Sequence, residues 1–208
     1  MSITLYHHPF SRAAGMLWAL EEVGVPYELH HVDILKGEQK QPLNADKNPM
    51  GKLPTLVDGD TVVTEGAAIC LYLGDRYSYG TLAPKHDDAA RGTYYRWSFF
   101  APSVIEPAAI TKLSKWDAKP GQVGWGDYDS MVATCESAIA GKQYVLGDNF
   151  SMADIVFGGC LRFMLRFKMM EPKPVFADYV SRLEQRPALQ RGDAKNNEII
   201  AAKGLDKK

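Results

Sequence analysis

Strand-like and helix-like patterns alternate at the start of the chain. Residues 3–6 (ITLY) form a short apolar strand pattern, and a helical stripe of apolar side chains runs from Ser11 to about Val23. The GVP sequence at residues 24–26 ends that helix, and residues 27–32 alternate like a second strand. A strand, a helix and a strand in this order predict a parallel pair with a right-handed crossover.

The next pattern predicts an antiparallel hairpin followed by a helix. Residues 36–47 are polar without a clear period, which indicates a loop with one short helix. Residues 55–57 and 61–63 are strand-like and flank the turn sequence DGD. Residues 67–76 place their apolar side chains on one helical face. This part of the chain therefore predicts a small α/β domain.

Helical periodicity dominates the chain after a linker-like stretch that begins at residue 78. That stretch contains glycine, proline and charged residues. Residues 115–128 hold two tryptophans, glycines and a proline, and they predict a loop or a broken helix. Helices are predicted over residues 89–101, 128–140, 152–167 and 175–186.

The helix predicted from residue 152 has a clear start signal. The Ser151 hydroxyl is placed to accept from the Asp154 N–H, and the Asp154 carboxylate is placed to accept from the Ser151 N–H. A carboxylate in the first turn also opposes the helix macrodipole. We therefore assign Asp154 a structural rather than a catalytic role.

The composition is that of an ordinary globular protein. The 208 residues are 46% hydrophobic and 24% charged, and the formal net charge of -1 argues against nucleic acid as a partner. No apolar run approaches the roughly 20 residues that a membrane span needs. The chain enters a strand pattern at once, so we expect no signal peptide.

The cysteines lie far apart in the sequence, each among apolar residues. They are Cys70, Cys135 and Cys160. We expect them to be reduced, buried thiols of a cytoplasmic protein. No pair has the spacing of a zinc site or of a thioredoxin-type redox motif, so we expect no metal.

The segment over residues 51–72 carries the most specific chemistry. Leu53-Pro54 stands at a strand entrance, where a proline leaves nearby backbone groups without a sheet partner. If the Leu53–Pro54 bond is cis, the Leu53 backbone also projects outward and an extended peptide can pair with it. Glu65 and the helix start at Gly66 add a cation site beside an anion site. This combination suits the zwitterionic end of a peptide.

The sequence GKLPTLVDGD followed by TEGAAI resembles the glutathione-binding half of the cytosolic glutathione transferases. The likeness continues through LYHHP and SR near the start, VD and KG at residues 32–37, and NFSMADI at residues 149–155. Most members of that family have a serine after the glutamate. Gly66 stands there in this chain, as in some bacterial members, and the chain is similar to the bacterial, theta- or beta-like type.

This resemblance implies a thioredoxin-like α/β domain over residues 1–77, a linker over 78–87 and an all-α domain over 88–208. It implies a glutathione transferase with glutathione as co-substrate and a homodimer with its active site near the subunit interface. The sequence leaves open whether the enzyme serves detoxification or a catabolic pathway.

The resemblance also implies how glutathione is held. Glu65 pairs with the γ-glutamyl ammonium, and the N–H of Gly66 binds the γ-glutamyl carboxylate. Glycine lacks the serine hydroxyl at this position but keeps the amide. The Leu53 backbone, aligned by Pro54, pairs with the cysteinyl backbone of the tripeptide.

The glycyl carboxylate of glutathione has less specific candidates. Lys52 and Gln39, or Lys40 in place of Gln39, lie where they can reach it. Lysine is also the commonest solvated surface residue, so a plain surface role is the alternative for these side chains.

Activation of the thiol needs a donor that stabilises the thiolate. A free thiol has a pKa of roughly 8.5, and lowering it by about two units favours the anion by roughly 2.7 kcal/mol. A helix N-terminus and one hydroxyl can supply this. Ser11 is the main candidate, with an ordinary N-cap as its alternative role. Tyr6 at the end of the first strand is the rival, and His7 and His8 are further polar groups there.

An apolar electrophile is expected between the thiol site and the helical half. The candidate lining residues, with core packing as their alternative role, are Phe10, Trp97, Phe100, Ile105, Trp116 and Phe163.

Two other functions stay open. One is a glutathione-dependent disulfide reductase, lyase or isomerase on the same scaffold, and the other is a non-catalytic relative that binds apolar ligands or partner proteins. No cysteine follows the first strand, which argues against a mixed disulfide with the protein itself.

Overall fold

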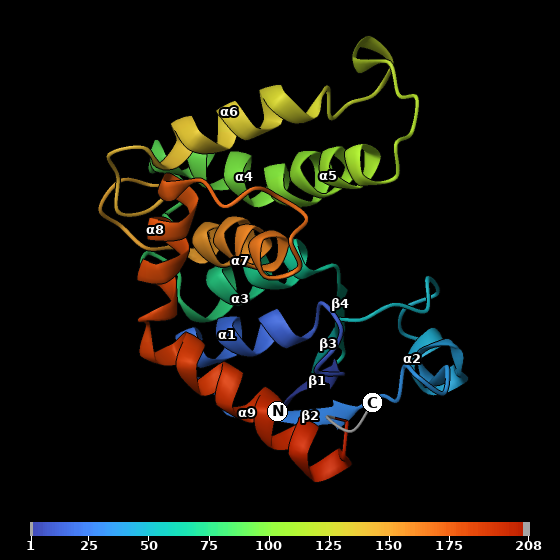
Figure 1. Cartoon of the computed structure of the whole chain (residues 1–208). Coiled ribbons are helices and arrows are strands. Elements are labelled where there is room, and N and C mark those ends of the chain that lie inside the picture. The colour runs from blue at the N-terminus through green and yellow to red at the C-terminus, as the bar shows by residue number, and fades with distance from the viewer. Residues whose placement is uncertain (1, 206–208) are drawn as a thin grey trace. The chain divides into compact units, whose positions relative to one another are not determined.

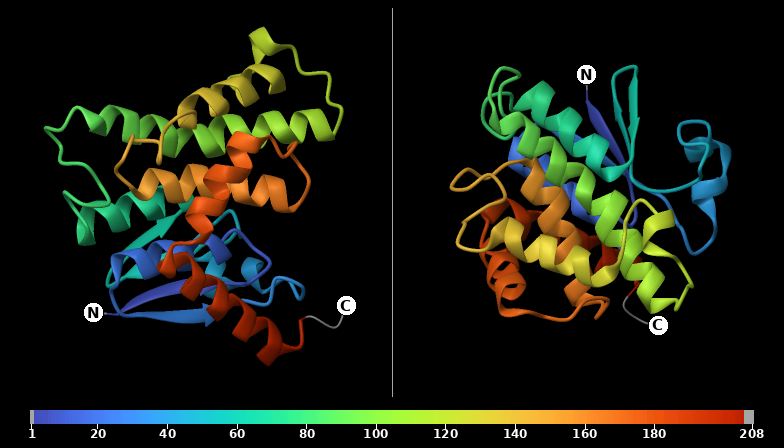
Figure 2. Two further views of the ribbon diagram at one scale, coloured as in Figure 1. Left: turned by 60° about the vertical axis from the view of Figure 1, so that its left-hand side comes forward. Right: turned by 90° about the horizontal axis from the view of Figure 1, so that it is seen from above.

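The computed structural model describes residues 2–205 and divides the chain into two compact units. One unit comprises Met1–Tyr77 together with Arg186–Lys208, and the other comprises Ser78–Gln185. The elements of each unit are shown in Figure 1 and from two further sides in Figure 2.

The first unit is built on a four-stranded mixed sheet. Its strands are β1 (Ile3–His7), β2 (Tyr27–His31), β3 (Thr55–Asp58) and β4 (Thr61–Thr64), in the spatial order β2-β1-β3-β4. β1 runs parallel to β2 and antiparallel to β3, and β3 runs antiparallel to β4. This confirms the predicted thioredoxin-like arrangement of a β-α-β unit followed by β-β-α.

The hairpin turn forms as its sequence predicts. Asp58 pairs with Thr61, which leaves Gly59 and Asp60 as a two-residue loop. Gly59 has a φ of 59°, and a glycine with positive φ at the first loop position suits the right-handed twist of the flanking strands.

Helices cover this sheet and hold its apolar core. They are α1 (Ala14–Val23), the short η1 (Glu38–Lys40) and α2 (Pro42–Ala45), α3 (Gly66–Tyr77) and α9 (Pro187–Lys203). The largest fully buried side chains of the unit are Leu5, Leu17, Leu20, Leu56, Ile69 and Leu73. The short helices lie within residues 36–47, where one short helix was expected.

The last helix, α9, packs along α1 within the first unit (Figures 1 and 2). The sequence grouped this region with the helical domain, and the difference has a physical cause. A Cβ at Gly192 would lie 3.0 Å from the backbone nitrogen of Trp18, so glycine lets the two helices approach more closely than a residue with a side chain would. Glu22 also receives two hydrogen bonds from the Arg186 guanidinium, at 2.5 and 2.8 Å.

The second unit is helical, as predicted. Its elements are α4 (Ala90–Phe100), the π-helical segment η2 (Ala101–Ile105), α5 (Glu106–Leu113), the 3-10 turn η3 (Pro120–Gln122), α6 (Tyr128–Ile139), α7 (Met152–Arg166) and α8 (Pro174–Glu184). α4, η2 and α5 follow one another without a break, so the helix predicted to end near residue 101 continues in a different winding. Within residues 2–205, no helix combines the length and apolar character that crossing a membrane requires.

The start of α7 has the predicted capping box. Ser151 and Asp154 exchange hydrogen bonds, and the Ser151 N–H donates to the carboxylate at 2.9 Å. The same carboxylate accepts from the Val145 N–H at 2.9 Å and from the Tyr179 hydroxyl at 2.7 Å. Asp154 is fully buried and its oxygens are occupied by these donors, which fits the structural role expected for it.

Candidate functional site

The segment before β3 leaves one backbone position unpaired. The Leu53–Pro54 peptide bond is cis. Leu53 precedes the first ladder residue, Thr55, and its N–H and C=O have no hydrogen-bond partner among residues 2–205. Leu53 is half-buried, and backbone groups without an internal partner are suited to pair with an extended ligand.

Two buried asparagines hold the residue that precedes this position. Asn48 donates from Nδ2 to the Lys52 carbonyl at 3.0 Å, and Asn44 donates to the same oxygen at 3.5 Å. Asn44 also donates to the Gln39 carbonyl at 2.9 Å, which ties the two segments together. Neither asparagine was predicted to contribute to the site, since polar residues in a polar loop give no local sign of burial.

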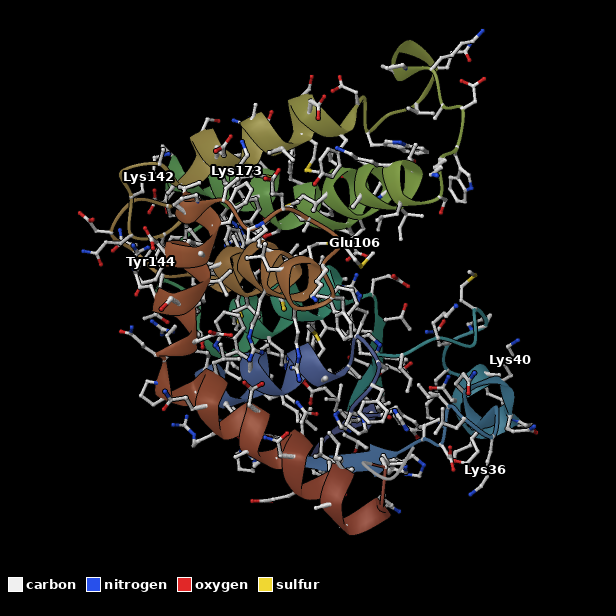
Figure 3. All side chains as sticks on the ribbon, viewed as in Figure 1. Lys36, Lys40, Glu106, Lys142, Tyr144 and Lys173 are labelled. Carbon is white, nitrogen blue, oxygen red and sulfur yellow. The ribbon has the colours of Figure 1, made fainter. Side chains whose placement is uncertain are left out.

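Gln39 and Lys52, both predicted to bind the glycyl carboxylate, therefore lie on neighbouring segments. Gly51, with a φ of 59°, fits closely against η1, because a Cβ there would lie 3.2 Å from the Lys40 side chain. The Oε1 atom of Gln39 is buried without a partner among the described residues, whereas Lys52 is exposed. Figure 3 labels Lys36 and Lys40 on this part of the chain.

Glu65 and Gly66 form the junction between β4 and α3. Glu65 has a φ of 67°, an uncommon conformation for a residue with a side chain that is often found at functional sites. Its carbonyl accepts from the Ile69 N–H at 2.9 Å, and its side chain is exposed. The first N–H groups of α3 thus point out of the helix beside a free carboxylate, which gives an anion site next to a cation site.

Ser11 lies in a turn before α1, not in the helix itself. The helix was expected to begin at Ser11, but it begins at Ala14. The Ser11 hydroxyl donates to the His8 carbonyl at 2.8 Å and accepts from the Ala13 N–H at 3.1 Å, so it stabilises the turn that leads into α1. The helix begins later because the Ser11 and Ala13 N–H groups bond within this turn, which the apolar periodicity cannot reveal.

The start of α1 favours negative charge nearby. Its first turn contains no acidic residue, and no side chain caps it. The positive end of the helix dipole is therefore not neutralised by a carboxylate of the first turn. Ser11 is half-buried beside this end, so a ligand sulfur placed there meets both the hydroxyl and the helix.

Tyr6 and His7 point to opposite faces of the sheet, because successive side chains of a strand alternate. The His7 ring contacts Asn196 of α9. The Tyr6 ring contacts His30 at a centroid distance of 4.7 Å, and the Lys47 ammonium lies 5.4 Å from its centroid. Tyr6 is 7% exposed and lies on the face away from α9.

Three histidines gather where β1 and β2 end. Burial lowers the pKa of His7 to about 4, against the smaller effect of its bond to Asn196, and burial also lowers the pKa of His8 and of His31. The His8 and His31 rings are 5.3 Å apart. These side chains are therefore neutral near pH 7 and supply no positive charge to this end of the sheet.

The candidate electrophile-lining residues differ in exposure. Phe10 is 54% exposed in the first unit, and Trp116 is 61% exposed in the second. Trp97 and Ile105 are buried, and Trp97 packs on Phe100 and on Phe157. For Trp97 and Ile105 this matches the alternative role of core packing.

The other two candidates are partly accessible in the second unit. Phe100 and Phe163 are half-buried, and Phe163 stacks on Phe167 with their centroids 4.5 Å apart. Trp116 lies elsewhere, in a cavity of about 410 Å³ between the end of α5 and the start of α6. Trp125 and Tyr128 line the same cavity.

The described residues offer neither a metal site nor a reactive cysteine. No group of three or more histidine, cysteine, aspartate or glutamate side chains is arranged to hold a metal within residues 2–205. The three cysteines are free and buried, and burial raises the pKa of Cys70 and of Cys135 to about 12. The expectation of reduced, buried thiols is confirmed for these positions.

Comparisons with known proteins identify the family of this chain. The family profile "Glutathione S-transferase, N-terminal domain" matches residues 1–75. The chain is 30% identical over 187 residues to glutathione S-transferase Z2 of Arabidopsis thaliana, with 83% of this chain and 81% of the relative covered. The chain belongs to the glutathione S-transferase family. Glutathione S-transferase 1 of Triticum aestivum is 40% identical over 217 residues, which cover 91% of this chain and 92% of the relative.

Solved structures of glutathione transferases share the fold. One from Burkholderia graminis, with two glutathione molecules bound per subunit, is 27% identical and has a TM-score of 0.73, covering 92% of this chain and 87% of its own. One from Phanerochaete chrysosporium with oxidized glutathione is 20% identical and has a TM-score of 0.77, covering 96% and 97%. The family and the fold therefore agree with the resemblance seen in the sequence.

Proposed function

We propose that this glutathione S-transferase binds glutathione along Leu53 and the start of α3 and activates the thiol as a thiolate at the start of α1. The unpaired backbone of Leu53 is the observation that carries the proposal. It lies beside a strand and a helix start, and it offers one donor and one acceptor to an extended peptide.

The γ-glutamyl end of glutathione is assigned to the junction between β4 and α3. The exposed Glu65 carboxylate accepts from its ammonium, and the N–H of Gly66 donates to its carboxylate. Gln39 and Lys52, on segments joined by Asn44, are assigned to the glycyl carboxylate at the other end. The chemistry of the two ends of glutathione supports this assignment. The fold that this chain shares with a solved relative containing glutathione supports it as well.

Ser11 is assigned as the thiolate donor in preference to Tyr6. Its hydroxyl lies beside the start of α1, whereas Tyr6 lies on the sheet face away from α9 and packs on His30. To donate to sulfur, the Ser11 hydroxyl turns away from the His8 carbonyl, while its N–H bond to the same carbonyl, at 3.0 Å, keeps the turn in place. The thiolate then attacks the electrophilic carbon, a bond from sulfur to carbon forms, and the leaving group departs with the bonding electrons.

Transfer to an electrophile is favoured over mixed-disulfide chemistry through the protein, because the described cysteines are buried with raised pKa values at Cys70 and Cys135. Each unit has partly accessible aromatic side chains that suit an apolar or planar electrophile, Phe10 in the first unit and Phe100 and Phe163 in the second. The family expectation of a homodimer is part of the proposal, and size-exclusion chromatography with light scattering tests it.

Turnover of chlorodinitrobenzene with glutathione tests the proposal directly. We expect conjugation in the wild type, and a loss of about 10-fold to 100-fold in kcat/KM for Ser11→Ala, since a charge-assisted hydrogen bond contributes roughly 1.5–3 kcal/mol. Tyr6→Phe should keep its activity. If both variants keep wild-type activity, the assignment of the thiolate donor is wrong, and if calorimetry shows no binding of glutathione, the site assignment falls with it.

A further inference from the structure

The loop that carries Ser11 is held at both of its ends by one side chain. The loop connects β1, which ends at His7, to α1, which begins at Ala14. Asn196 of α9 accepts at Oδ1 from His7 Nε2 at 2.7 Å and donates from Nδ2 to the Ala14 carbonyl at 3.2 Å. A residue 182 positions away from Ala14 in the sequence therefore joins the last residue of the strand to the first residue of the helix.

Chemistry fixes the orientation of this amide. The Ala14 carbonyl can only accept, so the NH₂ group of Asn196 faces it and the amide oxygen faces His7. His7 must then carry its hydrogen on Nε2, and its Nδ1 is left buried without a partner among residues 2–205. His7 is fully buried and Asn196 is 8% exposed, so water does not compete for these bonds.

The packing of α9 on α1 brings Asn196 to this place. Asn196 follows Gly192 by one helical turn, and the two share a face of α9. Gly192 permits the close approach to the Trp18 backbone, and the neighbouring Lys195 ammonium donates to the Glu21 carboxylate at 2.7 Å. The contact of Asn196 with the loop is thus set by the same helix pair that stabilises the first unit.

We propose that Asn196 is a positioning residue that holds the Ser11 loop in the geometry needed to stabilise the glutathione thiolate. The inference rests on the proposed role of Ser11. Asn196 does not touch the ligand. It fixes the distance between the end of β1 and the start of α1, and so it places the Ser11 hydroxyl and the first N–H groups of α1 together.

The test compares Asn196→Leu with Asn197→Leu. Asn197 is the same residue type at the next position of α9, but it is exposed and its side chain makes no hydrogen bond in the described part of the chain. The pKa of enzyme-bound glutathione is measured from the ultraviolet absorbance of the thiolate as a function of pH. We expect Asn196→Leu to raise this pKa by about 0.5–1 unit, and Asn197→Leu to leave it unchanged.

Binding and activity separate positioning from general damage. The dissociation constant of glutathione, measured by calorimetry at a pH below the pKa of the bound thiol, should change by less than about two-fold, since Leu53 and Gly66 are untouched. At a pH above the pKa of free glutathione the same constant should rise by about 3-fold to 10-fold, because a bound pKa that is higher by about 0.5–1 unit means weaker binding of the thiolate. The value of kcat/KM with chlorodinitrobenzene should fall about 3-fold to 10-fold. If Asn196→Leu fails to fold, Asn196→Asp replaces it in the same comparison. Aspartate keeps the oxygen facing His7 and loses the N–H that donates to the Ala14 carbonyl.

A double-mutant cycle with Ser11→Ala distinguishes the outcomes. If Asn196 acts through Ser11, Asn196→Leu adds little to the thiol pKa in the Ser11→Ala background. If Ser11→Ala raises the thiol pKa and Asn196→Leu does not, the positioning role is wrong while the proposed function stands. If Ser11→Ala itself leaves the thiol pKa unchanged, the thiolate assignment fails and the role of Asn196 fails with it.

Amide hydrogen exchange measures the stability of the Ser11 loop in the absence of any ligand. In Asn196→Leu we expect faster amide hydrogen exchange at Ser11 and Ala13, whose N–H groups bond to His8 and to the Ser11 hydroxyl. Unchanged exchange at both amides, with wild-type exchange elsewhere, overturns the proposal.

Discussion

The side-chain amide of Asn48 donates a 3.0 Å hydrogen bond to the carbonyl oxygen of Lys52. This bond lies immediately before Leu53, whose unpaired backbone is the proposed contact for the cysteinyl part of glutathione. Asn48 is 3% exposed, so the bond is shielded from water. The geometry of the proposed ligand-binding backbone thus depends on the Asn48 side chain.

Asn48→Ala should weaken both the fold and the binding of glutathione. Loss of the donor leaves the Lys52 carbonyl with the longer bond from Asn44 alone, so we expect a loss of about 1–3 kcal/mol in the free energy of unfolding. Urea denaturation and calorimetry with glutathione measure the two effects. Asn197→Ala, at an exposed position, is the control, and equal behaviour of the two variants contradicts the role given to Asn48.

Gly66→Ser should tighten glutathione binding. Gly66 does not have a positive φ, and a Cβ there would lie 3.5 Å from the Met16 methyl group, an ordinary contact. A serine hydroxyl at the start of α3 adds one donor to the γ-glutamyl carboxylate, so we expect a dissociation constant lower by about 3-fold to 10-fold. Calorimetry measures the dissociation constant of glutathione, and Gly66→Ala is the control that adds the Cβ without the hydroxyl. Equal affinities of the two variants would show that the hydroxyl reaches no ligand group.

Gly192→Ala and Gly15→Ala should change stability in opposite directions. At Gly192 the new Cβ would lie 3.0 Å from the Trp18 backbone nitrogen, so α9 and α1 must separate, and we expect a loss of about 1–3 kcal/mol. At Gly15, in the first turn of α1, no atom lies within 4 Å, and we expect a gain of about 0.5–1 kcal/mol from the lower entropy of the unfolded chain. Chemical denaturation of both variants measures the difference, and a stabilised Gly192→Ala protein would contradict the close contact.

Stability should fall on acidification because of His7. Its pKa is about 4 in the folded protein against 6.5 when unfolded, so above about pH 6.5 neither state is protonated. Between these values the unfolded state binds a proton that the folded state does not, and the free energy of unfolding decreases as pH falls, by roughly 3 kcal/mol in all. Urea unfolding at about pH 7 and about pH 4.5 measures this loss.

His7→Gln provides the matched control for that titration. Glutamine keeps an amide N–H for the Asn196 oxygen but cannot titrate. The free energy of unfolding should therefore decrease much less between the two pH values in His7→Gln than in the wild type. His8 and His31, whose pKa values are also lowered, contribute equally to both proteins. The same loss in wild type and in His7→Gln would show that His7 is not the group responsible.

The sequence by itself determined the features that depend on near neighbours. The Gly59-Asp60 hairpin and the Ser151–Asp154 capping box form as predicted, because turn geometry and helix capping involve residues within a few positions of one another. At the two predicted ligand-contact segments, the Leu53 backbone is unpaired among the described residues and the Glu65 side chain is exposed. These contacts are local, so the order of residues is sufficient to specify them.

Only the tertiary structure decided where distant parts of the chain meet. α9 carries many charged residues and looks like a solvated helix, yet Gly192 and Asn196 lie against α1 and β1. Asn48 reaches the Lys52 carbonyl from a loop whose polar sequence gives no sign of burial. Side-chain amides bond to whatever backbone group the fold brings near them, and that partner is set by packing across the chain rather than by the neighbouring residues.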